Sequence, residues 1–418
     1  MKHAAAAFSE KYPLIFQLFT TRLKLSLAAL ALLFITLAAS LYAQLIIESE
    51  DLFTKAGPII GGDFIVFRLA ATVAGAPDMI SIYEMANLKA MLQAAYPGKG
   101  EFNFAWMYPP TMSLLIAPFA APPYLASFTL WIALFGGAFL FTTSRLWADK
   151  WALFFVAASP TVFQATITGQ NGFLTATLLA AAGAFADRRP ILAGVAAGLL
   201  TIKPQLGLLI PIAFIAAGCW RAFFTAAVTA LLLAVASLAA YGPEVWVGFV
   251  DGVTAHGARM GGDGFPFNKL VTPFGFATML GAPAAVASLV QLVTTIGLAS
   301  YVFIVWRRVR DWDLRAAALS TAAMLATPYA FYYELVIMAP AMLLIARRAV
   351  LTGWLKYEQL TLIAVWIVPL MMPGQHGPPG LPACAIGAIL AALIAARRAI
   401  PAAGVTFASA GPMARAGS

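Results

Sequence analysis

Long apolar segments alternate with short polar breaks along most of the chain, and this pattern predicts an all-α integral membrane protein. A helix that crosses a bilayer needs about 20 mostly apolar residues. The first such segment, Leu23 to Ile47, is expected to be an uncleaved span. The expected spans are 23–47, 110–144 (bent between Pro118 and Pro123), 151–168, 171–186, 190–202, 204–220, 222–241, 284–306, 314–328, 330–346, 359–373 and 381–396. These make about twelve, and the shorter ones suggest tilted or broken helices around a polar cavity.

The connections between these segments predict an orientation. With the N-terminus inside, most of the Lys and Arg residues fall on the cytoplasmic side, as the positive-inside rule requires. Both long connections, 48–109 and 242–283, then face the periplasm of a bacterial inner membrane. Within the first, residues 82–92 predict a helix that either lies on the membrane surface or packs on the bundle. We expect one domain over 1–400 and a flexible cytoplasmic tail over 401–418.

The composition excludes several classes of protein. Hydrophobic residues make up 62% of the chain and charged residues only 10%, whereas soluble chains carry about 25% charged residues. The net charge of +9 is explained by topology, so no nucleic-acid partner is expected. Two cysteines and three histidines predict no disulfide scaffold, no metal site and no cofactor.

Polar residues at the outer membrane boundary need a reason in so apolar a chain. Asp63 follows Gly61 and Gly62, which let the backbone bend tightly beside a ligand; the alternative is that Asp63 only caps a helix. Tyr108 precedes two prolines at a helix start, and its hydroxyl could reach a cavity. Turn chemistry explains Asn171 but does not require Gln170, which is a candidate for a ligand hydrogen bond.

Charged residues on the same side supply further candidates. Lys203, followed by Pro204 and Gln205, breaks the positive-inside pattern and either reaches anionic headgroups or binds a specific anion. The second long connection contributes Arg259 and Lys269, although loop charges are often merely solvated.

Acidic residues occur at both sides of the membrane near the later spans. Glu334 opens an apolar span, which is costly unless the carboxylate is paired or lies at a helix N-terminus. Asp311 and Asp313 have the D-x-D spacing of a metal site but lie among arginines on the cytoplasmic side. We interpret this pair as charge balance.

The ordered series of motifs resembles glycosyltransferase family 87, of the GT-C superfamily, which includes mycobacterial α-1,2-mannosyltransferases. It comprises Asp63, then Tyr108-Pro109-Pro110, then Gly169-Gln170-Asn171, then Lys203-Pro204-Gln205, over roughly residues 20–350. The resemblance implies a GT-C-type bundle whose periplasmic loops carry short helices. It also implies a polyprenyl-phosphate-sugar donor and a glycolipid or glycan acceptor. A late family motif with a histidine resembles residues 327–334, where this chain has tyrosine instead.

The resemblance also implies a role for each candidate. Asp63 would be the general base of an inverting transfer. Lys203, Arg259 and Lys269 would bind the donor phosphate. The remaining candidates would bind the sugar or the acceptor: Tyr108, Gln170, Asn171, Gln205, Tyr332, Tyr333 and Glu334.

Two other functions compete with this interpretation. A secondary transporter or flippase of a lipid-linked sugar predicts ionisable residues near the bilayer midplane and inverted repeats. A non-catalytic membrane scaffold would leave Asp63 and Lys203 unexplained. The polar residues instead gather at one boundary, which favours the enzyme.

Overall fold

The structure is a computed structural model that describes residues 23–399 except 56, 100, 260–264, 356, 368 and 370–379. The expected tail 401–418 lies outside these residues. The elements begin with α3 (Leu23–Ile47), α4 (Phe64–Val73), η2 (Met79–Tyr83), α5 (Met85–Ala95), α6 (Pro110–Ile116), η3 (Ala117–Ala120), α7 (Tyr124–Leu146), α8 (Lys150–Ala157), α9 (Pro160–Thr168) and α10 (Gly172–Phe185). They continue with α11 (Pro190–Leu199), η4 (Leu200–Ile202), α12 (Pro204–Gly207), α13 (Ile210–Ala217), α14 (Trp220–Tyr241), α15 (Pro243–Arg259), η5 (Phe267–Lys269), α16 (Pro273–Met279), α17 (Ala284–Arg308), α18 (Trp312–Leu325), η6 (Tyr332–Ile337), α19 (Met338–Thr352), α20 (Glu358–Ile367) and α21 (Gly380–Ala399). The described part of the chain is helical, with isolated β-bridges and no strand.

The predicted helices are present close to their expected bounds, but the expected count of about twelve spans is not confirmed. Five described helices are long and apolar enough to cross a membrane, or six if α8 and α9, bent by 47° to each other, form one span. Several expected spans are too short because prolines and glycines interrupt them. The segment 204–220, for example, is split into α12 and α13.

Long outer helices surround short central ones. In α3, α7, α14 and α17 between 6% and 28% of the apolar window is buried, so most of their surface faces outward, where lipid would lie. In contrast, nearly every residue of α10 and α18 is buried, although each has only 14 residues. Fourteen residues rise about 21 Å, less than the about 30 Å of a hydrocarbon core. At least one end of each central helix is therefore recessed relative to the longer outer helices.

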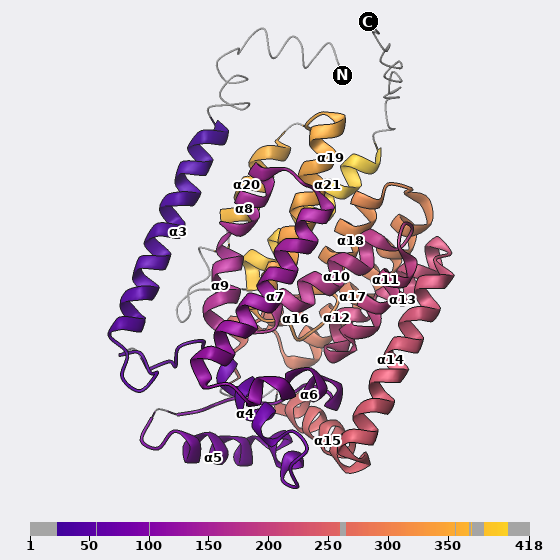
Figure 1. Cartoon of the computed structure of the whole chain (residues 1–418). Coiled ribbons are helices and arrows are strands. Elements are labelled where there is room, and N and C mark those ends of the chain that lie inside the picture. The colour runs from indigo at the N-terminus through magenta and orange to yellow at the C-terminus, as the bar shows by residue number, and fades with distance from the viewer. Residues whose placement is uncertain are drawn as a thin grey trace, which may run out of the picture.

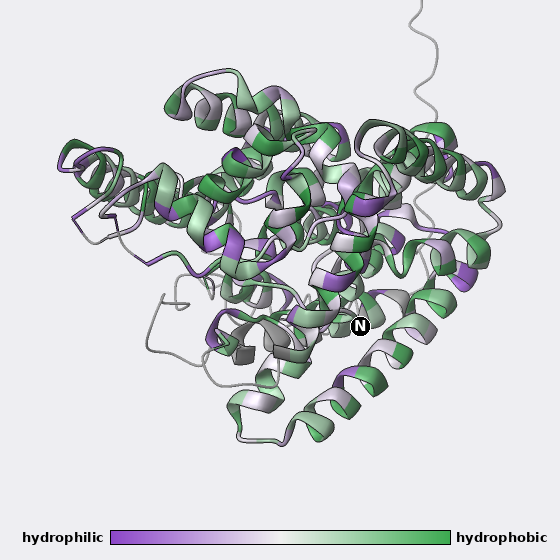
Figure 2. Ribbon diagram, turned by 90° about the horizontal axis from the view of Figure 1, so that it is seen from below, coloured by the Kyte–Doolittle hydropathy of each residue, from purple (hydrophilic) through white to green (hydrophobic). Residues whose placement is uncertain are grey.

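The short elements of the two long connections gather at one end of the bundle. Figure 1 shows α4, α5, α6 and α15 together at this end, while α3 stands at the side. In the view of this end, the long helices are mostly green and purple segments lie among the connections (Figure 2). In the segment predicted over 82–92, Ile82, Leu88 and Leu92 are fully buried in the core, so this segment packs on the bundle.

Candidate active site

Two glycine-containing turns, far apart in sequence, dock against each other and place Asp63. Gly62 and Gly169 have φ values of +51° and +59°, in the left-handed region that favours glycine. A Cβ on Gly169 would lie 2.4 Å from the carbonyl oxygen of Gly61, so this approach requires glycine. The backbone N–H of Asp63 donates to the carbonyl of Thr168 at 2.9 Å. The Gly-Gly-Asp and Gly-Gln-Asn motifs therefore form one rigid unit.

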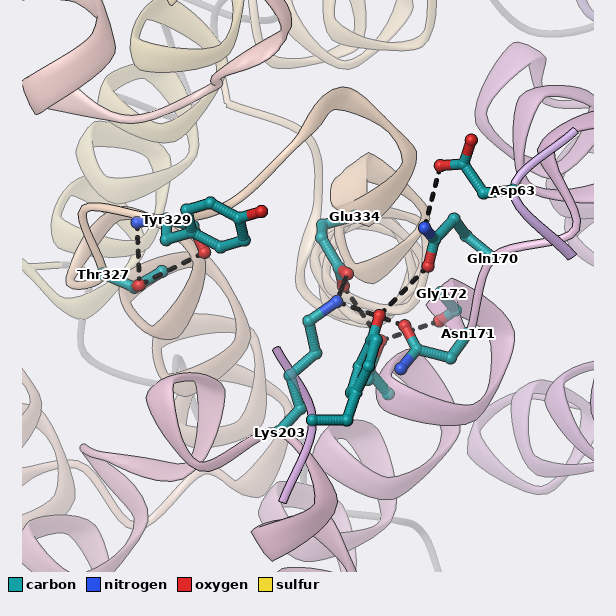
Figure 3. Close-up of polar contacts among 10 residues, drawn as sticks. Asp63, Gln170, Asn171, Gly172, Lys203, Thr327, Tyr329 and Glu334 are labelled. Carbon is teal, nitrogen blue, oxygen red and sulfur yellow. Dashed lines mark hydrogen bonds and ion pairs between the residues drawn. The ribbon is translucent and has the colours of Figure 1, made fainter. Parts of the chain in front are cut away.

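The Asp63 carboxylate points away from its own helix and into a polar network. Asp63 precedes α4, but its side chain makes no capping hydrogen bond, so a helix-capping role does not explain it. Its Oδ2 accepts from Gln170 Nε2 at 2.8 Å, and its Oδ1 is directed away from this contact (Figure 3). Among the described residues, Oδ1 accepts no hydrogen bond, while the half-buried side chain keeps some accessible surface. One carboxylate oxygen is thus held and the other is available.

The orientation of the Gln170 amide is fixed by a tyrosine. The Tyr108 hydroxyl donates to Gln170 Oε1 at 3.2 Å, so the amide nitrogen faces Asp63. The Tyr83 hydroxyl donates to the Tyr108 carbonyl at 3.1 Å and ties this segment to η2. Gln170 is only 8% exposed, so it acts from within the protein. We conclude that Tyr108 and Gln170 position Asp63.

Burial changes the acidity of this site. Desolvation raises the pKa of Asp63 above its ordinary value, because it penalises the charged form. The hydrogen bond from Gln170 and the charges of Lys269 and Lys203 lower the pKa but do not cancel the rise. Burial also raises the pKa of Tyr108 well above its ordinary value, so that its hydroxyl stays protonated as a donor. A carboxylate with a raised pKa is a stronger base.

Lys203 enters the core where a helix is broken. It lies between η4 and α12, and Pro204 opens the new helix. Its side chain is 5% exposed and donates to Asn171 Oδ1 at 3.1 Å. Its ammonium forms an ion pair with Glu334 and lies 5.6 Å and 5.3 Å from the ring centres of Tyr108 and Tyr333. The positive charge is therefore compensated inside the protein.

Glu334 is fully buried, and both of its carboxylate oxygens are engaged. One oxygen pairs with Lys203, and the other accepts from Thr175 Oγ1 at 3.0 Å. The close approach depends on Gly172, where a Cβ would lie 2.8 Å from the carbonyl oxygen of Tyr333. Glu334 therefore joins α10 to η6, and in this structure no oxygen is left to contact a ligand.

Lys269 contrasts with Lys203. The chain directly after Lys269 is anchored: Val271 N donates to the Ala330 carbonyl at 2.9 Å, and Leu270 forms a bridge with Phe331. Lys269 is exposed and makes no ion pair with any other described residue, yet its charge lowers the pKa of Asp63. Unlike Lys203, whose charge is paired with Glu334, Lys269 therefore keeps a positive charge that no described carboxylate compensates, and this charge acts on Asp63.

The remaining predicted site residues make few described contacts with the network around Asp63. Gln205 and Tyr332 are half-buried, and Gln205 makes no hydrogen bond with another described residue. The side chain of Arg259 lies outside what the structure describes, although its backbone ends α15. Two residues of the network were missed: Tyr329, whose pKa is raised by burial and by Asp63, and Thr175. Thr175 lies one helical turn after Asn171 on the same face of α10, and this spacing could have indicated it.

No metal centre is present in the described part of the chain, which has no group of three or more His, Cys, Asp or Glu that could hold an ion. The D-x-D residues are engaged elsewhere. Asp311 pairs with Arg348 at 2.7 Å, and Asp313 pairs with Arg347 at 2.5 Å. The interpretation of these two residues as charge balance agrees with these contacts.

Comparison with protein families gives one match. The model of glycosyltransferase family 87 matches residues 106–328, more than half of the chain. The matched segment contains Tyr108, Gln170, Asn171, Lys203 and Lys269, whereas Asp63 and Glu334 lie outside it. Comparisons with curated proteins and with solved structures find no match.

Proposed function

The chain belongs to glycosyltransferase family 87 and is a glycosyltransferase with membrane helices; we propose that it moves a hexose, mannose-like, from a polyprenyl-phosphate-sugar donor to a glycolipid or glycan acceptor. The transfer takes place at the periplasmic face of a bacterial inner membrane, with both termini in the cytoplasm. The observation that carries the proposal is the Oδ1 of Asp63, which accepts no hydrogen bond from any described residue and is held beside an engaged Oδ2. A preoriented carboxylate with a raised pKa is suited to general-base catalysis.

The proposed reaction is a single displacement. Asp63 Oδ1 takes the proton of the acceptor hydroxyl while that oxygen forms a bond to the anomeric carbon of the donor sugar. The bond from the anomeric carbon to the phosphate oxygen breaks, and polyprenyl phosphate leaves with the electron pair. Attack from the face opposite the leaving group inverts the anomeric configuration.

Charge compensation assigns the three cations different roles. Lys269 is the primary contact for the departing phosphate, because it is uncompensated among the described residues and acts electrostatically on Asp63. A fixed cation that meets developing negative charge lowers the barrier. Lys203 is instead a positioning residue, because its charge is already paired with Glu334. It holds Asn171, next to Gln170 in the chain, and so supports the contact to Asp63.

The architecture favours a lipid-linked donor. The site lies at one end of short, recessed central helices, and outward-facing apolar helices surround it. A donor with a long hydrocarbon tail can remain in the bilayer while its phosphate reaches the level of Lys269. Tyr332, Tyr333 and Gln205 are proposed to line the sugar's path, and Arg259 to assist at the phosphate.

The test is transfer in proteoliposomes that contain wild type or Asp63→Asn. Each is given a panel of radiolabelled polyprenyl-phosphate hexoses, nucleotide sugars as the alternative donor class, and a lipid acceptor extract. We expect label to enter a new glycolipid only with wild type and only from a polyprenyl-phosphate donor. Equal transfer by Asp63→Asn would contradict the mechanism. Transbilayer movement of an unconsumed donor would contradict the transferase proposal and favour a flippase.

A further inference from the structure

A cavity of about 300 Å³, lined in part by polar residues, opens at the same end of the bundle as Asp63. Its walls come from η2, from residues 105 and 107, and from one face of α15. Its size is at the lower end of the range of small-molecule sites. Neither the family match nor the network around Asp63 accounts for this cavity.

Glycines on α15 build the cavity wall. A Cβ on Gly248 would lie 2.6 Å from the Ile80 side chain, and a Cβ on Gly252 would lie 2.8 Å from the Tyr83 carbonyl oxygen. Because Gly248 and Gly252 have no side chains, α15 packs directly against η2. The rings of Phe249 and Tyr83 are in contact, with 6.0 Å between their centres. The cavity is therefore bounded by rigid, closely packed backbone.

The charged groups in the cavity are acidic. Glu84, which follows η2, and Asp251, on α15, both line it, and no described Lys or Arg does. Glu84 accepts from Asn87 at 2.8 Å through Oε2. Carboxylates beside an aromatic ring form hydrogen bonds to sugar hydroxyls and repel an anion. This lining contrasts with the donor side, where Lys269 acts on Asp63.

The cavity and the Asp63 network share a wall. Met107 lines the cavity, and the next residue, Tyr108, holds the Gln170 amide that contacts Asp63. His256 also lines the cavity, and its ring lies 5.6 Å from the ring of Tyr329, a residue on which Asp63 acts electrostatically. A ligand in the cavity would thus lie beside the segment that positions the base.

From this juxtaposition we propose that the cavity binds the saccharide of the acceptor and selects a neutral or amine-bearing sugar over an acidic one. This inference rests on the proposed transferase function and adds the acceptor class to it. Glu84 and Asp251 are its specificity-determining residues. A uronic-acid acceptor would bring a second negative charge against them and be rejected.

Direct binding tests the inference without turnover. Asp63→Asn protein in detergent is titrated with a neutral methyl hexopyranoside and with the corresponding methyl hexuronide, and the dissociation constants are measured by ligand-observed NMR. We expect the neutral glycoside to bind at least about tenfold more tightly. Adding Glu84→Gln and Asp251→Asn should reduce this ratio to about threefold or less, mainly by strengthening hexuronide binding. Adding Asp78→Asn, an exposed carboxylate outside the cavity, should leave the ratio unchanged.

The outcomes separate the two proposals. A neutral glycoside that does not bind, or a ratio that Glu84→Gln and Asp251→Asn leave unchanged, would overturn the inference, even if wild type transfers sugar. The expected binding pattern without any transfer by wild type would overturn the proposed function and leave the cavity as a saccharide site. In the transfer assay, the two cavity substitutions should alter the KM for the acceptor and not that for the donor.

Discussion

Carboxylates gather at both ends of the central helices α10 and α18, but the two groups differ in how they are paired. The ends of α10 are about 21 Å apart. At one end, Asp63 has one engaged oxygen and one without a partner among the described residues. At the other, carboxylates pair with arginines: Asp187 with Arg315, Asp311 with Arg348, and Asp313 with Arg347.

Glu358 extends the contrast, because it is fully buried and yet fully paired. Arg397 contacts both of its carboxylate oxygens, including an Nε to Oε1 contact of 2.6 Å. A buried carboxylate is therefore not by itself a sign of chemistry in this protein. The difference lies in whether an arginine completes the pair, and at Asp63 an amide takes the place of the arginine.

The largest loss of stability is expected where one partner of the buried Lys203–Glu334 pair is removed. Lys203→Met or Glu334→Leu alone would leave an unpaired buried charge, at a cost of about 3–5 kcal/mol. The double variant should recover most of this stability, because replacing both charges by apolar groups is often neutral. Transfer should stay impaired in the double variant because Asn171 loses its donor. Thermal unfolding checks this, and a double variant no more stable than the singles would contradict the pairing.

A smaller, purely kinetic effect is expected at Lys269. Lys269→Gln should lower kcat/KM for the donor about 100-fold, because a cation facing the departing phosphate is lost. Lys269→Arg should retain most of the activity. The control, Lys89→Gln, removes a lysine whose partner Glu101 is 78% exposed and should not change the rate. An unaffected Lys269→Gln enzyme would refute the phosphate assignment.

The next effect in size is expected in the pH dependence of the transfer rate. Transfer needs ionised Asp63, whose pKa is raised by burial, so the rate should rise with pH through a midpoint above the ordinary range for aspartate. Gln170→Leu removes a hydrogen bond to the charged form and should shift this midpoint upward by about one pH unit. Gln164→Leu, which loses only a bond to the Pro369 carbonyl, should leave the profile unchanged. A downward shift in Gln170→Leu would contradict the assigned geometry.

The same raised pKa has a consequence for stability. The folded state binds the Asp63 proton more tightly than the unfolded state does. This contribution to stability is present at low pH and is lost as the pH rises from the unfolded to the folded pKa. The active, ionised form is thus the less stable one. Asp63→Asn should therefore be at least as stable as wild type near neutral pH.

The smallest effect is expected at the arginine-paired end. Asp311→Ala removes a partly exposed pair with Arg348 and the helix cap on Leu314 N at 3.2 Å. Together these contribute about 1 kcal/mol. The free energy of unfolding should fall by this amount, and the transfer rate per folded molecule should not change. A loss of transfer would mean that the two ends of α10 are coupled.

The sequence was informative about the helices and about which polar residues lie close together, for identifiable reasons. Hydropathy located α3 to the residue, since it spans Leu23–Ile47 as expected, but it did not show that the segment 204–220 is divided into α12 and α13. The number of membrane crossings could not be predicted as well, because several apolar segments form helices of only 10–17 residues, such as α10, and their length depends on how they pack in the bundle. The motif order brought Asp63, Gln170 and Lys203 into one hypothesis, and the structure places them in one network.

The pairing of these residues could not be predicted from the sequence. Lys203 was expected to meet a ligand anion, but Glu334, 131 residues later, compensates its charge. Nothing local to Lys203 signals this contact, which depends on the break before Pro204 and on the close approach at Gly172. The cavity beside Tyr83 was likewise hidden, because it needs α15 to pack on η2.

The most direct test of the account compares two neutralised carboxylates in the same proteoliposome assay, with the amounts of folded protein matched. Asp63→Asn should transfer about 1000-fold more slowly than wild type while folding normally. Glu358→Gln leaves Arg397 without its charged partner and should lose about 3–5 kcal/mol of stability, yet transfer at the wild-type rate per folded molecule. The reverse pattern, with Asp63→Asn active and folded Glu358→Gln inactive, would contradict the assignment of the chemistry to the end of the bundle that carries Asp63.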